Sequence, residues 1–181
     1  MKYSVPVKMD LCPLVNTDLP TDRHHTRLSM NTQVNKSVFQ FFDNLNLEIG
    51  HVEIFFMKPN AKNLSCHIDG SMPENEWQSR TKLNLIISGL GSTMNWYDTD
   101  MNLAGSQGTT TINTSYIPFD LSKSTLIEST VLSGWNLVEV GIPHAISNLG
   151  EPRWCISIFF RKNKDWVTLA DSKDIFENFI A

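Results

Sequence analysis

The chain has 181 residues, a length that predicts one domain able to bury a substantial hydrophobic core. Apolar residues make up 41% of the sequence and charged residues 19%, which is ordinary for a globular protein and excludes a disordered chain. The formal net charge of -4, without any cluster of lysines and arginines, argues against a protein that holds nucleic acid by its phosphates.

The N-terminal part of the chain predicts a surface segment followed by one helix. The first thirty residues contain three prolines among polar residues, as expected of a loop or an edge strand. Over residues 31–47, with Asn31 or Thr32 as a cap, apolar residues recur at helical spacing: Val34, Val38, Phe41, Phe42 and Leu45. Their aromatic face predicts a helix that packs against a sheet.

After Gly50 the spacing of apolar residues becomes that of β-strands. Polar or glycine-bearing turns separate the predicted strands, which cover residues 51–57, 64–69, 82–88, 93–97, 115–119, 125–132, 135–140 and 153–160. Gly89 and Gly91 indicate a hairpin between the third and fourth strands, and residues 98–114 indicate a surface loop or lid. Residues 171–180 predict a short amphipathic helix.

This succession predicts a mainly β fold that forms a single domain over residues 1–181. Many short strands between turns are typical of a two-sheet sandwich or jelly roll, whose core we place at about residues 48–161. Three widely spaced cysteines form neither a zinc pattern nor a disulfide framework. Because no stretch resembles a signal peptide or a transmembrane helix, we expect a soluble, cytoplasmic protein without membrane contacts.

The sequence His67-Ile68-Asp69 carries the clearest chemistry in the chain. Side chains two residues apart in a strand point to the same face, so His67 and Asp69 can both reach one metal ion. A later turn supplies a third candidate ligand, His144. Two histidines and one carboxylate form the ligand set that non-haem Fe(II) oxygenases use.

Arg153 begins an otherwise apolar strand, and the sequence offers it no obvious acidic partner. An unpaired guanidinium is very costly to bury. A ligand carboxylate, held by two parallel hydrogen bonds, would satisfy it. The residue therefore predicts an anionic ligand close to the candidate metal site.

The order of these residues, with Arg153 nine positions after His144, resembles that of the 2-oxoglutarate- and Fe(II)-dependent dioxygenases. Residues 141–153 are similar to the last two barrel strands of that family, and residues 80–84 and 95–97 are similar to segments of its members. The resemblance covers roughly residues 64–160. It implies a double-stranded β-helix, a cupin-like jelly-roll barrel with the metal near its mouth.

The resemblance also implies roles for single residues. His67, Asp69 and His144 would be the catalytic Fe(II) ligands and leave coordination positions for 2-oxoglutarate and O2. Arg153 would bind the distal carboxylate of 2-oxoglutarate. Oxidative decarboxylation would then release succinate and CO2 while a substrate is hydroxylated.

One departure from the family concerns the hydroxyl that often assists the arginine. Cys155 stands where members often have a serine, so Ser157, Asn84 and Tyr97 are the candidates for that part of the co-substrate site. For Asn84, a structural role bonding the neighbouring backbone is an equal alternative.

The sequence says less about the identity of the primary substrate. A protein or peptide side chain, or a small molecule, fits the small size of the chain, and Arg80 and Trp96 are candidate substrate contacts with core packing as the alternative. One competing hypothesis is a cupin-type isomerase or ligand sensor with His51 as a further metal ligand. The other is a jelly-roll binding module without catalysis.

Overall fold

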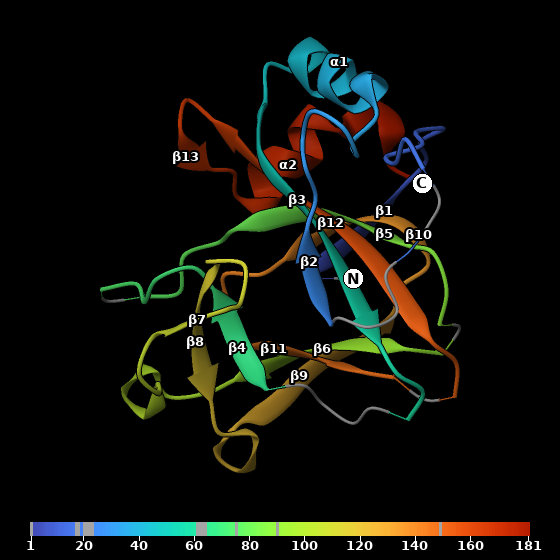
Figure 1. Cartoon of the computed structure of the whole chain (residues 1–181). Coiled ribbons are helices and arrows are strands. Elements are labelled where there is room, and N and C mark those ends of the chain that lie inside the picture. The colour runs from blue at the N-terminus through green and yellow to red at the C-terminus, as the bar shows by residue number, and fades with distance from the viewer. Residues whose placement is uncertain are drawn as a thin grey trace.

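The computed structural model describes residues 2–16, 19, 24–60, 65–74, 76–89, 91–148 and 150–181. Two antiparallel sheets form the body of the protein (Figure 1). The first sheet contains, in spatial order, β1 (Ser4–Val7), β10 (Gly134–Glu139), β5 (Thr81–Ile86), β12 (Arg153–Lys162), β3 (Glu48–Met57) and β2 (His25–Arg27), with β13 (Asp165–Trp166) paired to β12. The second contains β7 (Gly108–Thr109), β8 (Ser115–Phe119), β4 (Cys66–Asp69), β11 (His144–Ser147), β6 (Thr93–Asp98) and β9 (Thr125–Val131).

The chain alternates between the sheets as it passes through the strands that carry the candidate site. Strands β3, β5, β10 and β12 belong to the first sheet, whereas β4, β6, β9 and β11 belong to the second. The hairpin predicted across Gly89 and Gly91 is therefore wrong, because β5 and β6 lie in different sheets. Both glycines have positive φ, which lets the chain leave one sheet and enter the other.

Two helices cover the outer side of the first sheet, opposite the second sheet (Figure 1). Helix α1 (Lys36–Asn44) is shorter than predicted because Asn35, rather than Asn31 or Thr32, accepts the capping hydrogen bond from Ser37 N. Helix α2 (Leu169–Ile175) starts after Thr168, whose side chain accepts from Asp171 N. Single 3-10 turns lie at Met101–Leu103, Leu121–Lys123 and Glu177–Phe179.

The side-chain alternation of β12 explains how one strand serves both a core and a site. Ile156, Ile158 and Phe160 point toward the helices, where the Phe160 ring lies 5.6 Å from that of Phe42. Arg153, Cys155 and Ser157 have the opposite parity and face the space between the sheets. The fold is thus mainly β with two helices on one sheet, as the sequence predicts. None of the helices among the described residues is long and apolar enough to span a membrane.

Candidate metal centre

One pair in the strand register brings the three candidate metal ligands together. His67 on β4 lies directly opposite His144 on β11. Cys66 and Ile68, which flank His67 on β4, are fully buried on the other face, so His67 and Asp69 point into the space between the sheets. The ligand atoms of His67, Asp69 and His144 all lie within 4.8 Å of one another.

Both imidazoles are held in the orientation that a metal ligand needs. His67 Nδ1 lies 2.6 Å from the Ser65 carbonyl oxygen, and His144 Nδ1 lies 2.9 Å from that of Ile142. A carbonyl oxygen only accepts, so each Nδ1 carries a proton, and in the neutral imidazole Nε2 then has the lone pair that a metal would bind.

The distance between two of the ligand atoms is close to the distance expected between two ligands of one metal ion. His67 Nε2 lies 3.4 Å from Asp69 Oδ1. Two ligands about 2.1 Å from an ion and at right angles to each other are about 3 Å apart, so small side-chain rotations would complete the site. The residues therefore fit a metal that accepts two imidazoles and one carboxylate, as non-haem iron does.

Burial and neighbouring charge set the protonation states of the three ligands. Burial, with the nearby His67, lowers the pKa of His144 to about 4, so this imidazole is neutral at neutral pH. Burial alone would raise the pKa of Asp69, but Lys82 and His67 outweigh it and hold the pKa well below its usual range. Burial opposes charge on His67 too, yet the hydrogen bond to Asp69 raises the pKa of this imidazole. A neutral imidazole and an ionised carboxylate are the forms that bind metals.

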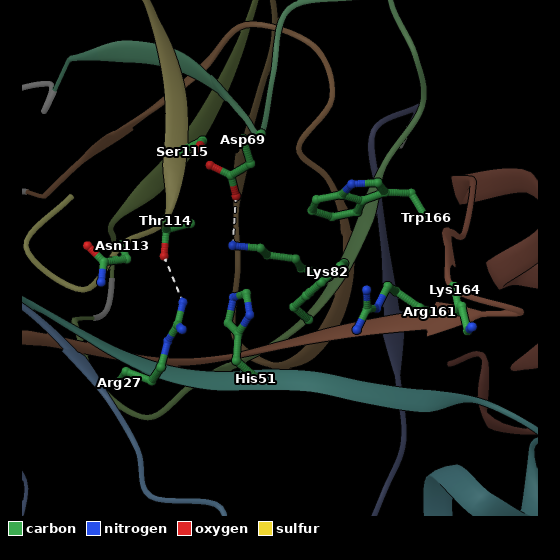
Figure 2. A pocket seen from close by; sticks show the side chains of 12 residues that line it. Arg27, His51, Asp69, Lys82, Asn113, Thr114, Ser115, Arg161, Lys164 and Trp166 are labelled. Carbon is green, nitrogen blue, oxygen red and sulfur yellow. Dashed lines mark hydrogen bonds and ion pairs between the residues drawn. The ribbon is translucent and has the colours of Figure 1, made fainter. Parts of the chain in front are cut away.

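Lys82 on β5 holds the second oxygen of the Asp69 carboxylate. Its Nζ lies 2.8 Å from Asp69 Oδ2 (Figure 2). The same nitrogen lies 3.4 Å from Glu53 Oε2, and the Lys82 side chain is 4% exposed. Burial lowers the pKa of Lys82, but the two carboxylates outweigh it and raise the pKa overall. Since Oδ2 is engaged by Lys82, Oδ1 is the oxygen left for a metal. Lys82 could have been found from the sequence, because it is a charged residue in a predicted strand and shares a face of that strand with Asn84.

A second carboxylate, Glu53 on β3, is fully buried next to Lys82 and is surrounded by basic side chains. Its oxygens lie 3.0 Å from His51 Nε2, 3.4 Å from His25 Nε2 and 3.8 Å from an Arg27 guanidinium nitrogen. Thr114 donates a hydrogen bond of 2.8 Å to the same carboxylate. His51 thus contacts Glu53 and does not belong to the group of three ligand atoms. The position of Glu53 within an apolar strand could have indicated this buried charge cluster from the sequence.

A cavity of about 480 Å³ adjoins the three ligands, and it also contains Arg153, Asn84 and Ser157 in its wall. Ser157 and Asn84 are direct register partners on β12 and β5. The Asn84 Oδ1 atom is buried and has no hydrogen-bond partner among the described residues. This wall offers unused hydrogen-bonding capacity to a ligand.

Arg153 lies in the wall of the same cavity, as its sequence context predicts. It is 3% exposed, and its Nε donates a hydrogen bond of 3.0 Å to Ser92 Oγ. None of the described carboxylates lies within 4.0 Å of its guanidinium. A buried guanidinium beside a cavity has the charge and geometry to bind an anion.

The three other predicted site residues lie outside the cavity wall. Trp96 is fully buried and donates through Nε1 to the Glu139 carbonyl oxygen at 2.8 Å. Tyr97 packs in the apolar cluster on the far side of β4. Arg80 donates to the Asp69 carbonyl oxygen and lies 5.7 Å from the centre of the Trp166 ring, so it supports the end of β4.

Comparisons of the chain with family models, with curated proteins and with solved structures find no match. Function therefore has to be inferred from the chemistry of the site.

Proposed function

We propose that the protein is an Fe(II)- and 2-oxoglutarate-dependent dioxygenase that hydroxylates a peptide side chain or a small molecule. The observation that carries the proposal is the placement of Arg153 in the same cavity wall as His67, Asp69 and His144. A candidate metal site and an arginine that has no carboxylate partner among the described residues share one cavity, which suits a co-substrate with a chelating end and a carboxylate end.

The order of the strands supports the proposal. Eight of them form two four-stranded layers, β10-β5-β12-β3 and β4-β11-β6-β9, and successive strands mostly alternate between the layers. Two antiparallel layers connected in this way are expected of a jelly-roll or double-stranded β-helix barrel. The candidate ligands lie on β4 and β11, in the layer that faces Arg153 on β12.

Each residue of the site has a specific task in this proposal. His67, Asp69 and His144 would hold Fe(II), and Lys82 would keep Asp69 bound through one oxygen only. Arg153 would bind the distal carboxylate of 2-oxoglutarate, with Asn84 and Ser157 along the wall between. The bound iron, with 2-oxoglutarate and O2, supplies oxidative decarboxylation to succinate and CO2 coupled to oxidation of the substrate. The enclosing sheets limit the access of water to this space.

Anaerobic addition of Fe(II) and 2-oxoglutarate tests the proposal through the metal-to-ligand charge-transfer band of the chelate. We expect a band with the wild-type chain and none with His67→Ala. In Arg153→Gln the apparent affinity for 2-oxoglutarate should fall about 10- to 100-fold, because hydrogen bonds to charged groups contribute about 1.5–3 kcal/mol.

Lys123→Gln, on an exposed 3-10 turn, is the matched control and should leave both measurements unchanged. Release of succinate in air without added substrate tests turnover. Absence of the band from the wild-type chain would overturn the proposal, and a band without succinate release would indicate a metal-dependent binding module.

A further inference from the structure

A second pocket opens beside Asp69, on the side away from Arg153. It has a volume of about 350 Å³ and shares Asp69, Lys82, Thr114 and Ser115 with the larger cavity. A molecule in this pocket would therefore touch a candidate iron ligand without occupying the space beside Arg153.

The charges of this pocket are strongly one-sided. Its wall contains the cations Arg27, Lys82, Arg161 and Lys164, and Asp69 is the one carboxylate among its lining residues that the structure describes. Figure 2 shows Arg27 on one side of the pocket, with Arg161 and Lys164 on the other. Lys82 is matched by two carboxylates and Arg27 lies near Glu53. An excess of positive charge remains on the side of Arg161 and Lys164.

Arg161 is the cation in this pocket whose hydrogen bonding is least satisfied among the described residues. Its Nε is buried and has no hydrogen-bond partner in the described part of the chain, and its guanidinium lies 5.5 Å from the centre of the Phe159 ring. Glu48, its register partner on β3, is not among the ion pairs of the described residues. A buried donor without a partner is costly, and a bound anion would supply the missing acceptor.

The register of β12 separates this group from the proposed co-substrate anchor. Arg153 and Arg161 have the same parity and lie about 26 Å apart along the strand, at about 3.3 Å per residue. Lys82, which contacts Asp69, lies opposite Phe159 and so nearer to the Arg161 end. The metal site therefore lies between two cationic positions that cannot be bridged by one small diacid.

We infer that the primary substrate carries a carboxylate or phosphate group, which Arg161 binds in this second pocket beside the iron. The identification of this anion with the primary substrate rests on the proposed oxygenase function. Asn113, Thr114 and Ser115 supply polar contacts on the opposite wall, while Trp166 and Phe159 form an apolar side for the carbon part of the substrate. The rest of the substrate would extend past Asp69 toward the larger cavity, whose wall contains all three candidate metal ligands.

Binding of simple anions tests the pocket independently of catalysis. Inorganic phosphate and acetate are titrated separately into metal-free protein while the indole N–H resonance of Trp166, assigned with Trp166→Phe, is followed by NMR. We expect at least one of the anions to shift this resonance, with binding weakened at least tenfold in Arg161→Gln and partly restored in Arg161→Lys. The anion that binds more tightly distinguishes a carboxylate from a phosphate substrate.

The matched control is Lys162→Gln, which removes one positive charge from the neighbouring position of β12 outside the pocket wall. Equal weakening in Arg161→Gln and Lys162→Gln, or no shift of Trp166 with either anion, would overturn the inference.

A second measurement separates this inference from the proposed function. In Arg161→Gln the affinity for 2-oxoglutarate, read from the charge-transfer band, should stay within about twofold of wild type. A tenfold loss there would mean that Arg161 binds the co-substrate and would overturn the inference. Absence of the band in every protein, with phosphate binding intact, would remove the oxygenase proposal but leave the anion pocket.

Discussion

His67 and His144 are direct register partners on the neighbouring strands β4 and β11, and their ring centres lie 4.6 Å apart. Each imidazole makes its Nδ1 hydrogen bond to the carbonyl oxygen two residues earlier in its own chain segment. The backbone thus orients both rings before any ligand binds. Such preorganisation lowers the cost of forming a metal site.

Metal binding should therefore stabilise the wild-type protein and depend on both histidines. We expect Fe(II), added without oxygen, to raise the melting temperature, and a chelator to reverse the rise, because a metal that binds only the folded state stabilises it. His144→Ala should abolish the shift. His24→Ala, a histidine outside the group of three ligands, should retain it. An equal shift in His144→Ala and the wild-type protein would argue against this centre.

Substitution of Gly89 should disturb Arg153 specifically. Gly89 has a φ of +91°, and a Cβ there would lie 2.6 Å from Arg153 Cβ and 3.0 Å from its Cα. We expect Gly89→Ala to weaken 2-oxoglutarate binding while Fe(II) binding persists, as measured by titration of the charge-transfer band.

Gly91→Ala provides the control for backbone strain. Its φ of +85° imposes a similar conformational cost, about 1–2 kcal/mol, but a Cβ there meets nothing within 4 Å. If both variants weaken 2-oxoglutarate binding equally, the contact with Arg153 is not the cause.

Asn84→Ala distinguishes a co-substrate contact from a structural role. The Asn84 Oδ1 atom is buried and unpartnered among the described residues, so its removal should cost little stability. We expect the denaturation midpoint to change only slightly and 2-oxoglutarate affinity to fall several-fold. Loss of stability with unchanged affinity would assign the residue to the scaffold.

Glu53→Gln should destabilise the protein in a pH-dependent way. Burial alone would raise the pKa of Glu53, but Lys82 and two histidines hold it far below the ordinary value of 4.5. The carboxylate therefore stabilises the fold above about pH 4.5, and this contribution is lost as the pH falls below that value. We expect Glu53→Gln to cost about 3 kcal/mol at pH 7.

Urea unfolding of both proteins between pH 7 and pH 3 measures this difference. The free energies of unfolding should differ by a constant amount down to about pH 5 and converge at lower pH. A difference of the same size at pH 3 and pH 7 would show that the effect of Glu53 is not electrostatic.

The strands and the chemistry of the candidate ligands were predictable from local patterns. The His67 and Asp69 pair shares a face because strand side chains alternate, and this holds in any β-strand of that sequence. Burial of Arg153 beside an apolar run predicted a ligand-facing cation, and the structure places it in the cavity wall. The ligand atoms of His67, Asp69 and His144 lie within 4.8 Å of one another, so these residues could hold a metal ion, as the predicted ligand set requires.

The roles of other residues could not be predicted from local patterns because they depend on partners far away in the chain. Core packing was the alternative to a substrate contact for Trp96, and Trp96 lies in an apolar cluster. Tyr97, a candidate for the co-substrate site, lies in another. Arg80 was a candidate substrate contact with packing as the alternative, and its guanidinium donates to the Asp69 carbonyl oxygen on β4. Local sequence does not specify which strands become neighbours.

The sequence by itself determined which residue types are present, which faces of the strands they occupy, and hence that two imidazoles, a carboxylate and an arginine could act together. Only the tertiary structure decided that Lys82 contacts one oxygen of Asp69 and that Glu53 lies close to His25 and His51. It also decided that Arg161 borders a second pocket. The physical reason is that alternation along a strand is set by the local backbone. Charge pairing between β3, β4 and β5, by contrast, arises only after long-range strand pairing and sheet packing bring distant residues within a few ångströms.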